Sequence, residues 1–292
     1  MNISIISRPL ACLSAVTVLL TSCRDVAVLV PSVEGADSLE APAKQAFVWI
    51  AGEDEPVTYS KNGSDVVYPA SITKLAVALY AMELMPTETI IEPGEETYFP
   101  PEGSSFAYIR PQHTLTLEML IEGMLIPSGN DAAYVVAVAC GRSIAEEDIE
   151  AHEAVEVFME GLNDYVAELG CTSTHFTVPD GFAGAEHYST SYDIALIARA
   201  AVENEVIMRY AGMYEDDVIY ASGHINHWTN TNELLDPTSS SYDECAIGLK
   251  TGSTEGNYCL VAVYEDGSII GVFGCPTDSA RYTAVEKIRN VG

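Results

Sequence analysis

The chain contains, from Val66 to Met85, the stretch VVYPASITKLAVALYAMELM, whose apolar run after Pro69 predicts a buried helix beginning near that proline. Ser71 and Lys74 stand three residues apart just inside its start. Residues three apart share one helix face, so the hydroxyl and the amine are expected to lie together. The pair is either a coincidence on the surface or a nucleophile beside its base, and the rest of the chain decides between these.

Bulk composition indicates a globular and strongly acidic protein. The 292 residues are 48% hydrophobic, which suits one domain of about 250 residues or two smaller ones. Because 43 acidic residues face 13 Lys and Arg, the net charge of −30 disfavours nucleic acid and anionic lipid headgroups as partners. The simpler interpretation is a solvated acidic shell of a secreted protein. The alternative is an acidic rim that attracts a cationic substrate group.

The N-terminal sequence resembles an export signal. One early positive charge, Arg8, precedes an apolar run from Leu10 to Leu20 that is too short to span a bilayer comfortably. The run closes on Leu-Thr-Ser-Cys at 20–23, which resembles the lipobox of bacterial lipoproteins and implies cleavage before Cys23 and acylation of that cysteine. An ordinary signal peptide is the alternative. We expect a signal peptide over 1–22, a tether over 23–43 and anchoring to the outer face of the cell membrane through lipidated Cys23.

One domain is expected over residues 44–292. Strand-like runs occur at both ends, in a sheet region formed by 44–65 and 244–292, and helical patterns fill the region 66–243. One of these patterns, residues 143–170, predicts a single long amphipathic helix with an acidic beginning. The arrangement indicates a sheet assembled from both ends of the chain, with helices packed on it, in an α/β protein of the α+β type.

The cysteines of the mature domain are odd in number and mostly lie in apolar runs, where cysteine acts as a small hydrophobe. We therefore predict buried free thiols and no disulfide. No C-x-x-C motif or Cys/His cluster suggests a metal site. These five cysteines are Cys140, Cys171, Cys245, Cys259 and Cys275.

Three short motifs follow one another in a fixed order. Residues 71–74 form S-x-x-K on the predicted helix, 128–130 form S-x-N between two helices, and 250–252 form K-T-G on a strand. Each motif alone is weak. In this order and these settings, they form the signature of penicillin-binding proteins and related β-lactamases.

The likeness extends well beyond the motifs. The blocks YPASITKLAVAL, LTLEMLIEGMLIPSGNDAAYVVA, YSTSYDIALIARA and GLKTGSTEGNYCLVA resemble the serine-type D-alanyl-D-alanine carboxypeptidases, the low-molecular-weight penicillin-binding proteins. The resemblance runs from about Gln45 to the C-terminal helix. It implies a β-lactamase/transpeptidase-like fold, with an antiparallel five-stranded sheet covered by helices on both faces, plus a mostly helical subdomain. It also implies removal of the terminal D-Ala from peptidoglycan stem pentapeptides, and inhibition by β-lactams.

Elementary chemistry supports the roles of the first motif. A serine hydroxyl is a poor nucleophile until a base takes its proton. Lys74 can act as that base if burial and the nearby charge of Lys250 lower its pKa. Ser71 would then attack the carbonyl between the two D-alanines.

Family analogy supplies the other roles. Ser128 would pass a proton to the departing amine, and Asn130 would hold the substrate's amide. The carboxylate of the leaving residue would meet Lys250 and Thr251, and the oxyanion would meet backbone N–H groups. The remaining implied contacts are Gly252, which lets the substrate backbone approach the strand, and the N–H donors of Ser71 and Ser253. No metal or organic cofactor is needed, and no obligate protein partner is evident.

Some positions depart from the family pattern. Ser253 stands where many relatives have His or Tyr, and Val178 and Asp180 stand where relatives often carry Asn and His. These positions shape the pocket floor and bear on how fast water clears the acyl-enzyme.

Three alternative functions share these motifs. A DD-endopeptidase acting on cross-links shares every one of them. A class A-like β-lactamase is disfavoured because no E-x-x-L-N segment lies between Ser128 and Lys250. An inactive β-lactam-sensing or wall-binding lipoprotein is disfavoured by the intact Ser71, Lys74, Ser128 and Lys250.

Overall fold

The computed structural model describes residues 41–60 and 66–290 of the chain. The predicted signal peptide, Cys23 and most of the predicted tether lie outside these residues. Within the described ranges, no helix combines the length and the apolar character that crossing a bilayer requires.

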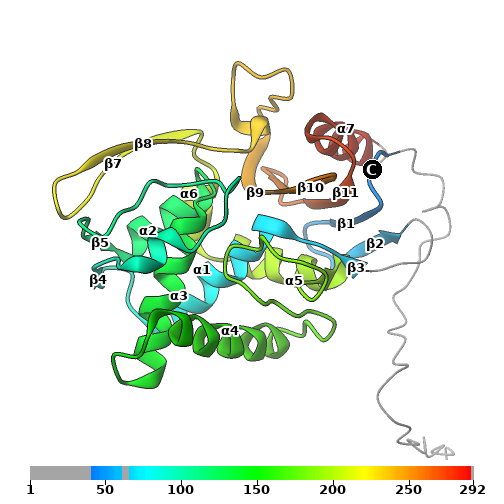
Figure 1. Cartoon of the computed structure of the whole chain (residues 1–292). Coiled ribbons are helices and arrows are strands. Elements are labelled where there is room, and N and C mark those ends of the chain that lie inside the picture. Colours follow the sequence, from blue (N-terminus) through cyan, green and yellow to red (C-terminus); the bar gives the residue numbers. More distant parts are fainter. Residues whose placement is uncertain (1–40, 61–65, 291–292) are drawn as a thin grey trace, which may run out of the picture. The chain divides into compact units, whose positions relative to one another are not determined.

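A five-stranded antiparallel sheet contains strands from both ends of the chain, as predicted (Figure 1). The N-terminal hairpin of β1 (Gln45–Trp49) and β2 (Val57–Ser60) joins the C-terminal strands through pairing of β1 with β11 (Ile269–Cys275). The strand order is β2-β1-β11-β10-β9. The remaining two strands are β10 (Asn257–Tyr264) and β9 (Ala246–Thr254), and β9 stands at the edge of the sheet.

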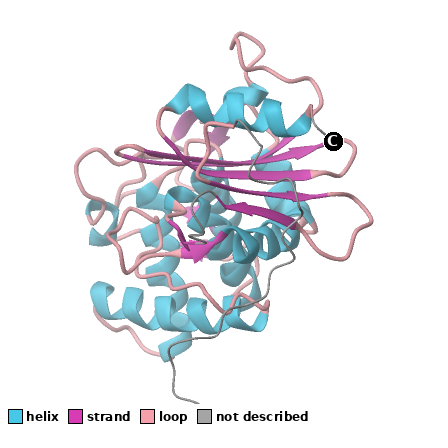
Figure 2. Ribbon diagram, turned by 90° about the vertical axis from the view of Figure 1, so that its right-hand side faces the viewer, coloured by secondary structure: helices cyan, strands magenta, loops and turns pink. Residues whose placement is uncertain are grey.

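Helices cover both faces of this sheet (Figure 2). Side chains along a strand alternate between its two faces, and β10 follows this rule. Leu260 and Ala262 pack in the cluster that contains α7 (Asp278–Arg289), whereas Val261 and Val263 belong to the larger core beneath the sheet. That larger core contains the buried residues of the helical region. The sheet is therefore a layer between one helix and a helical body.

The helical region contains six α-helices and three small two-stranded sheets in its described part. The helices are α1 (Thr73–Leu84), α2 (Leu117–Leu125), α3 (Asn130–Ala145), α4 (Ala151–Glu168), α5 (Ser191–Val202) and α6 (Glu205–Ala211). The strand pairs are β3 (Val66–Val67) with β6 (Ser189–Thr190), β4 (Ile90–Ile91) with β5 (Leu115–Thr116), and β7 (Glu215–Ile219) with β8 (Ile225–Thr229). The side chain of Thr190 accepts the N–H of Asp193, so this residue caps α5.

The prediction of one long helix over 143–170 is wrong. α3 continues through its first residues and ends at Ala145, Glu146 takes a left-handed conformation with φ of 56°, and α4 begins at Ala151. The reversal lets α4 pack back on α3, so closely that any side chain on Gly141 would overlap the backbone of Ala154. Burying the apolar side of α4 against α3 outweighs continuing one exposed helix. The β7–β8 hairpin was not predicted either.

Candidate active site

Ser71 and Lys74 lie together, as their spacing predicted. Ser71 is not in the helix itself but in a 3₁₀ turn, η2 (Ala70–Ile72), that leads directly into α1. Ala70 in this turn has a φ of 50°, an uncommon backbone conformation for a residue with a side chain. Lys74 in the first turn of α1 donates from Nζ to Ser71 Oγ over 2.8 Å. Ser71 is therefore partly exposed, whereas the Lys74 amine that donates to its hydroxyl is buried.

Lys74 is fully buried and hydrogen-bonded to three acceptors. Besides Ser71, its Nζ donates to Asn130 Oδ1 over 2.7 Å and to the backbone oxygen of Asp180 over 3.0 Å. Burial lowers the pKa of Lys74 to about 8, although the charges of Asp180 and Asp131 oppose this effect. Burial is thus the main cause of the shift, where the sequence had suggested burial together with Lys250. At neutral pH a minority of molecules carries a neutral Lys74 that can accept a proton.

The S-x-N motif forms the joint between α2 and α3. Ser128 is buried with a φ of 59°, and the Asn130 that holds Lys74 is the first residue of α3. The next residue, Asp131, accepts the N–H groups of Ala107 and Ile109, each over 2.8 Å. These bonds attach the preceding loop to the start of α3. The joint is therefore a rigid wall of the site.

The unpredicted β7–β8 hairpin supports the same wall. Trp228 of β8 donates from Nε1 to the oxygen of Ala107 over 3.0 Å, and Asn226 donates to that oxygen over 2.7 Å. Trp228 is buried beside Tyr220. The alternation of INHWT, with Asn226 and Trp228 on one side, is the sequence signal that could have revealed this strand.

The K-T-G motif lies on edge strand β9, beside the Ser71 turn. Lys250 and Thr251 are buried, and Thr251 Oγ1 lies 2.5 Å from Thr231 Oγ1. A side chain on Gly252 would overlap the oxygen of Pro69, so only glycine lets β9 pack this closely on the turn. Gly252 thus allows the 3₁₀ turn that carries Ser71, called the nucleophile turn below, to pack against β9. The sequence had not suggested this role.

Three buried basic side chains, those of Lys74, Lys250 and Arg281, influence one another near this edge. The pKa of Lys250 is lowered well below its usual value, first by burial and then by the charges of Lys74 and Arg281. Arg281 comes from α7 and is buried, and it donates to Ser253 Oγ over 2.9 Å and to the Gly252 oxygen over 3.4 Å. Arg281 is also ion-paired with Asp278. A carboxylate that binds at this edge would favour the charged form of Lys250.

Sequence reasoning missed Arg281. A signal was present, because Arg281 lies on the same helix face as the apolar residues Ala284, Val285 and Ile288. A charged residue on the buried face of a helix needs a specific partner.

The loop that follows α4 packs against Ser71, Thr73 and Lys74 and forms the floor of the site. His187 Nε2 lies 2.8 Å from Thr73 Oγ1, and the N–H of Thr177 donates to His187 Nδ1 over 3.0 Å. Burial lowers the pKa of His187 to about 4, so this imidazole stays neutral and fixes the loop to α1. Asn163 of α4 adds two bonds of 2.8 Å to the backbone of Phe176. The loop thereby presents the Asp180 oxygen to Ser71 Oγ, which donates to it over 3.4 Å.

A substitution at Gly181 tests whether the packing of this loop against the Ser71 turn matters for stability and acylation. Its φ is +76°, and an added side chain would overlap the Ala70 oxygen in the nucleophile turn. We expect Gly181→Ala to lower the melting temperature by several degrees and to slow acylation, because the loop and the turn cannot keep their contact. Gly184→Ala in the same loop, where nothing lies within 4 Å of the added carbon, is the matched control. Equal melting temperatures and rates for both variants would contradict this account of the floor.

One cysteine, Cys259, lies beside the site, because it pairs with Gly252 across the sheet and its backbone oxygen accepts a hydrogen bond from Arg281. Cys140, Cys171 and Cys259 are buried free thiols, as expected, and burial raises the pKa of Cys140 to about 12. Cys275 is also buried, while Cys245 is only half-buried. Among the described residues no group of His, Cys, Asp and Glu is arranged to hold a metal ion.

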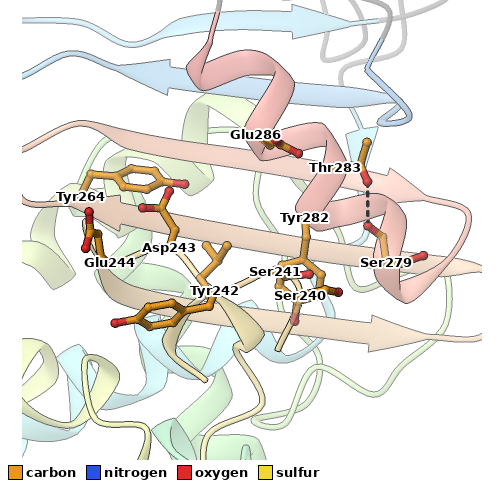
Figure 3. A pocket seen from close by; sticks show the side chains of 11 residues that line it. Ser240, Ser241, Tyr242, Asp243, Glu244, Tyr264, Ser279, Tyr282, Thr283 and Glu286 are labelled. Atoms are coloured by element: carbon orange, nitrogen blue, oxygen red, sulfur yellow. Dashed lines mark hydrogen bonds between the residues drawn. The ribbon is translucent and has the colours of Figure 1, made fainter. Parts of the chain in front are cut away.

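A polar cavity of about 580 Å³ lies apart from the motifs, between α7 and the segment before β9 (Figure 3). Its lining includes the carboxyl groups of Asp243, Glu244 and Glu286. Asp243 is paired with Arg289. None of the S-x-x-K, S-x-N or K-T-G residues lines this cavity.

Comparison with known proteins agrees with this geometry. A family profile described as D-alanyl-D-alanine carboxypeptidase matches residues 33–272. The chain is 31% identical over 253 residues to D-alanyl-D-alanine carboxypeptidase DacF of Bacillus subtilis, covering 84% of this chain and 61% of that protein. It is 34% identical over 187 residues to a D-alanyl-D-alanine carboxypeptidase of Streptomyces sp. K15, covering 61% of each.

A solved structure shows the same fold. The crystal structure of the Streptomyces K15 DD-transpeptidase superposes with a TM-score of 0.74 at 28% identity, covering 86% of this chain and 96% of that one. The predicted β-lactamase/transpeptidase-like fold is thereby confirmed. The chain spans about three fifths of the length of the first curated relatives it matches.

Proposed function

Since the chain belongs to the D-alanyl-D-alanine carboxypeptidase family, we propose that it removes the terminal D-alanine of peptidoglycan stem pentapeptides through an acyl-enzyme on Ser71. The observation that carries this proposal is the 2.8 Å bond between Ser71 Oγ and the buried Nζ of Lys74. A buried amine with a pKa near 8 beside a serine hydroxyl is a general base beside its nucleophile.

Acylation follows from this geometry. Neutral Lys74 takes the proton of Ser71 as Oγ attacks the carbonyl carbon between the two D-alanines. The N–H groups of Ser71 and Ser253 hold the oxyanion, because Gly252 packs β9 on the Ser71 turn. Ser128 passes a proton to the departing amine, and Asn130, fixed by its bond to Lys74, holds the substrate's amide.

Recognition of the terminal carboxylate falls to the K-T-G edge. Lys250 and Thr251 would bind it, and Arg281, which donates to Ser253 Oγ, would add positive charge nearby. An incoming carboxylate replaces the solvation that Lys250 lost on burial, so it raises the pKa of Lys250 and favours the ammonium form. A penicillin carboxylate would use the same donors, which accounts for β-lactams as inhibitors.

Acylation is expected to depend on pH through Lys74. Because the neutral amine is the active form, the second-order rate of penicillin labelling should rise with pH and level off above a pKa near 8. Stopped-flow labelling with a fluorescent penicillin between pH 5.5 and 9.5 measures this profile. A rate that is flat across this range, or that falls with increasing pH, would exclude Lys74 as the base.

The substrate is tested by incubating the protein with diacetyl-Lys-D-Ala-D-Ala and measuring free D-alanine. We expect release that stops after penicillin treatment, and no release of alanine from the same peptide ending in L-Ala. Penicillin labelling without D-alanine release would favour the sensing alternative. Steady turnover of nitrocefin would favour a β-lactamase, and release only from cross-linked dimers would favour an endopeptidase.

The location of the enzyme follows from its substrate and from its N-terminal sequence. We propose that it acts outside the cytoplasm, held at the membrane by a lipid on Cys23. The lipobox-like residues 20–23 and the apolar run before them support this proposal. Labelling of the full-length protein with a fatty acid, lost in Cys23→Ala, tests it.

A further inference from the structure

One acidic group in the site has no role in the steps above. The Asp180 side chain is buried, with 1% of the residue exposed. Its Oδ1 accepts the N–H of Phe182 over 3.0 Å, whereas its buried Oδ2 has no hydrogen-bonding partner among the described residues. Buried carboxylate oxygens are nearly always hydrogen-bonded, so this atom calls for a ligand.

The backbone of Asp180 contacts the reacting atoms directly. The backbone oxygen of the same residue accepts hydrogen bonds from both Lys74 Nζ and Ser71 Oγ. Burial lowers the pKa of Lys74 on α1 and raises that of Tyr134 on α3, and the charge of the nearby Asp180 carboxylate is a smaller, upward influence on both pKa values. Burial in turn raises the pKa of Asp180, and Lys74 opposes that shift.

The position of Asp180 is fixed by the fold. The His187–Thr73 contact clamps one side of its loop, and Gly181 packs directly on the Ala70 oxygen of the nucleophile turn. The residue that carries the unpartnered oxygen is therefore held against Ser71 and Lys74, through its backbone, by elements outside the three motifs. A group that positions a reactant must itself be held in place.

We propose that the Asp180 carboxylate binds the water that hydrolyses the acyl-enzyme and takes its proton, which makes water the acceptor of the acyl group. This inference rests on the proposed function, because it requires an acyl-enzyme on Ser71. The Streptomyces K15 relative is named both as a carboxypeptidase and as a DD-transpeptidase. In this family a residue is therefore needed that decides whether water or an amine receives the acyl group.

The step balances with one proton transferred. The water oxygen forms a bond to the acyl carbon as Oδ2 of Asp180 accepts a water proton. Asp180 passes this proton to the neutral amine of Lys74. Lys74 then gives it to Oγ along the 2.8 Å bond as the bond between the acyl carbon and Ser71 Oγ breaks. The net change is hydroxide added to the acyl group and hydrogen added to Ser71.

The test compares full-length wild type with Asp180→Asn, which keeps the shape of the side chain. Acylation by a fluorescent penicillin is measured at pH 9, where Lys74 is mostly neutral in both proteins, and acyl-enzyme lifetime is measured after removal of free penicillin. We expect at least about a tenfold longer lifetime and less than about a threefold change in acylation rate. Glu186→Gln, which removes an exposed carboxylate from the same loop, is the matched control.

A chemical rescue separates a role in water activation from a structural one. Hydroxylamine needs less help from a base than water does, so it should clear the acyl group from Asp180→Asn and from wild type at similar rates. An unchanged lifetime, or acylation and deacylation slowed by the same factor, would overturn the proposal. If Asp180→Asn fails to fold, wild-type deacylation should still slow towards acid pH as Asp180 is protonated, and a flat profile would overturn the proposal. Failure of wild type to be labelled at Ser71 would instead overturn the proposed function.

Discussion

Ser71→Ala is expected to abolish covalent labelling by penicillin, with a loss of at least about 10³-fold. No other group can replace the attacking oxygen, because the bond to the inhibitor forms at Oγ itself. The fold should survive, since the substitution removes one partly exposed hydroxyl whose bonds are to Lys74 and to the Asp180 oxygen. Gel fluorescence after incubation with a fluorescent penicillin measures labelling, and circular dichroism measures the melting temperature.

Ser222→Ala, in the β7–β8 turn, is the matched control and should label like wild type. If Ser71→Ala still labels at a rate near that of wild type, another residue is the nucleophile. A loss of labelling that accompanies unfolding would not count as support.

Lys74→Met is expected to slow acylation by about 10²- to 10⁴-fold, the usual contribution of a general base. The variant should also lose the rise in rate near pH 8, because that rise reports the neutral Lys74 amine. Methionine fits the volume of the buried stem but leaves Asn130 Oδ1 and the Asp180 oxygen without this donor. We therefore also expect a loss of about 1–3 kcal/mol in unfolding free energy.

Rate and stability are measured separately for this variant, by stopped-flow labelling and by urea unfolding. Lys287→Met removes an exposed lysine from α7 and serves as the control for loss of one charge. A Lys74→Met enzyme that keeps the wild-type pH profile, at any rate, would mean that another group takes the serine proton.

Local sequence patterns were sufficient for much of the fold. The strands of the sheet were recognisable because β9, β10 and β11 are apolar runs separated by Gly-containing turns. The three motifs predicted which side chains gather, since their chemistry depends on short spacings such as that of Ser71 and Lys74. The structure adds contacts that the motifs did not predict, because Asn130 accepts a hydrogen bond from Lys74 and Gly252 packs against the turn that carries Ser71.

Long-range packing explains what the sequence did not reveal. The break between α3 and α4 depends on how closely Gly141 and Ala154 approach, which no local pattern records. Arg281 comes from α7, and its burial beside Ser253 and Lys250 is visible only when that helix is placed in space. Asp180 drew attention in the sequence as a departure from the family pattern, but its buried carboxylate oxygen without a partner is visible only in the structure.

The central claim is that the hydroxyl of residue 71 becomes acylated, and peptide mapping by mass spectrometry tests it most directly. After brief incubation with benzylpenicillin, trypsin should release the peptide of residues 62–74 carrying the mass of one intact penicillin, with fragmentation placing it on Ser71. An adduct on any other residue, or an unmodified peptide under conditions that inactivate the enzyme, would contradict the account.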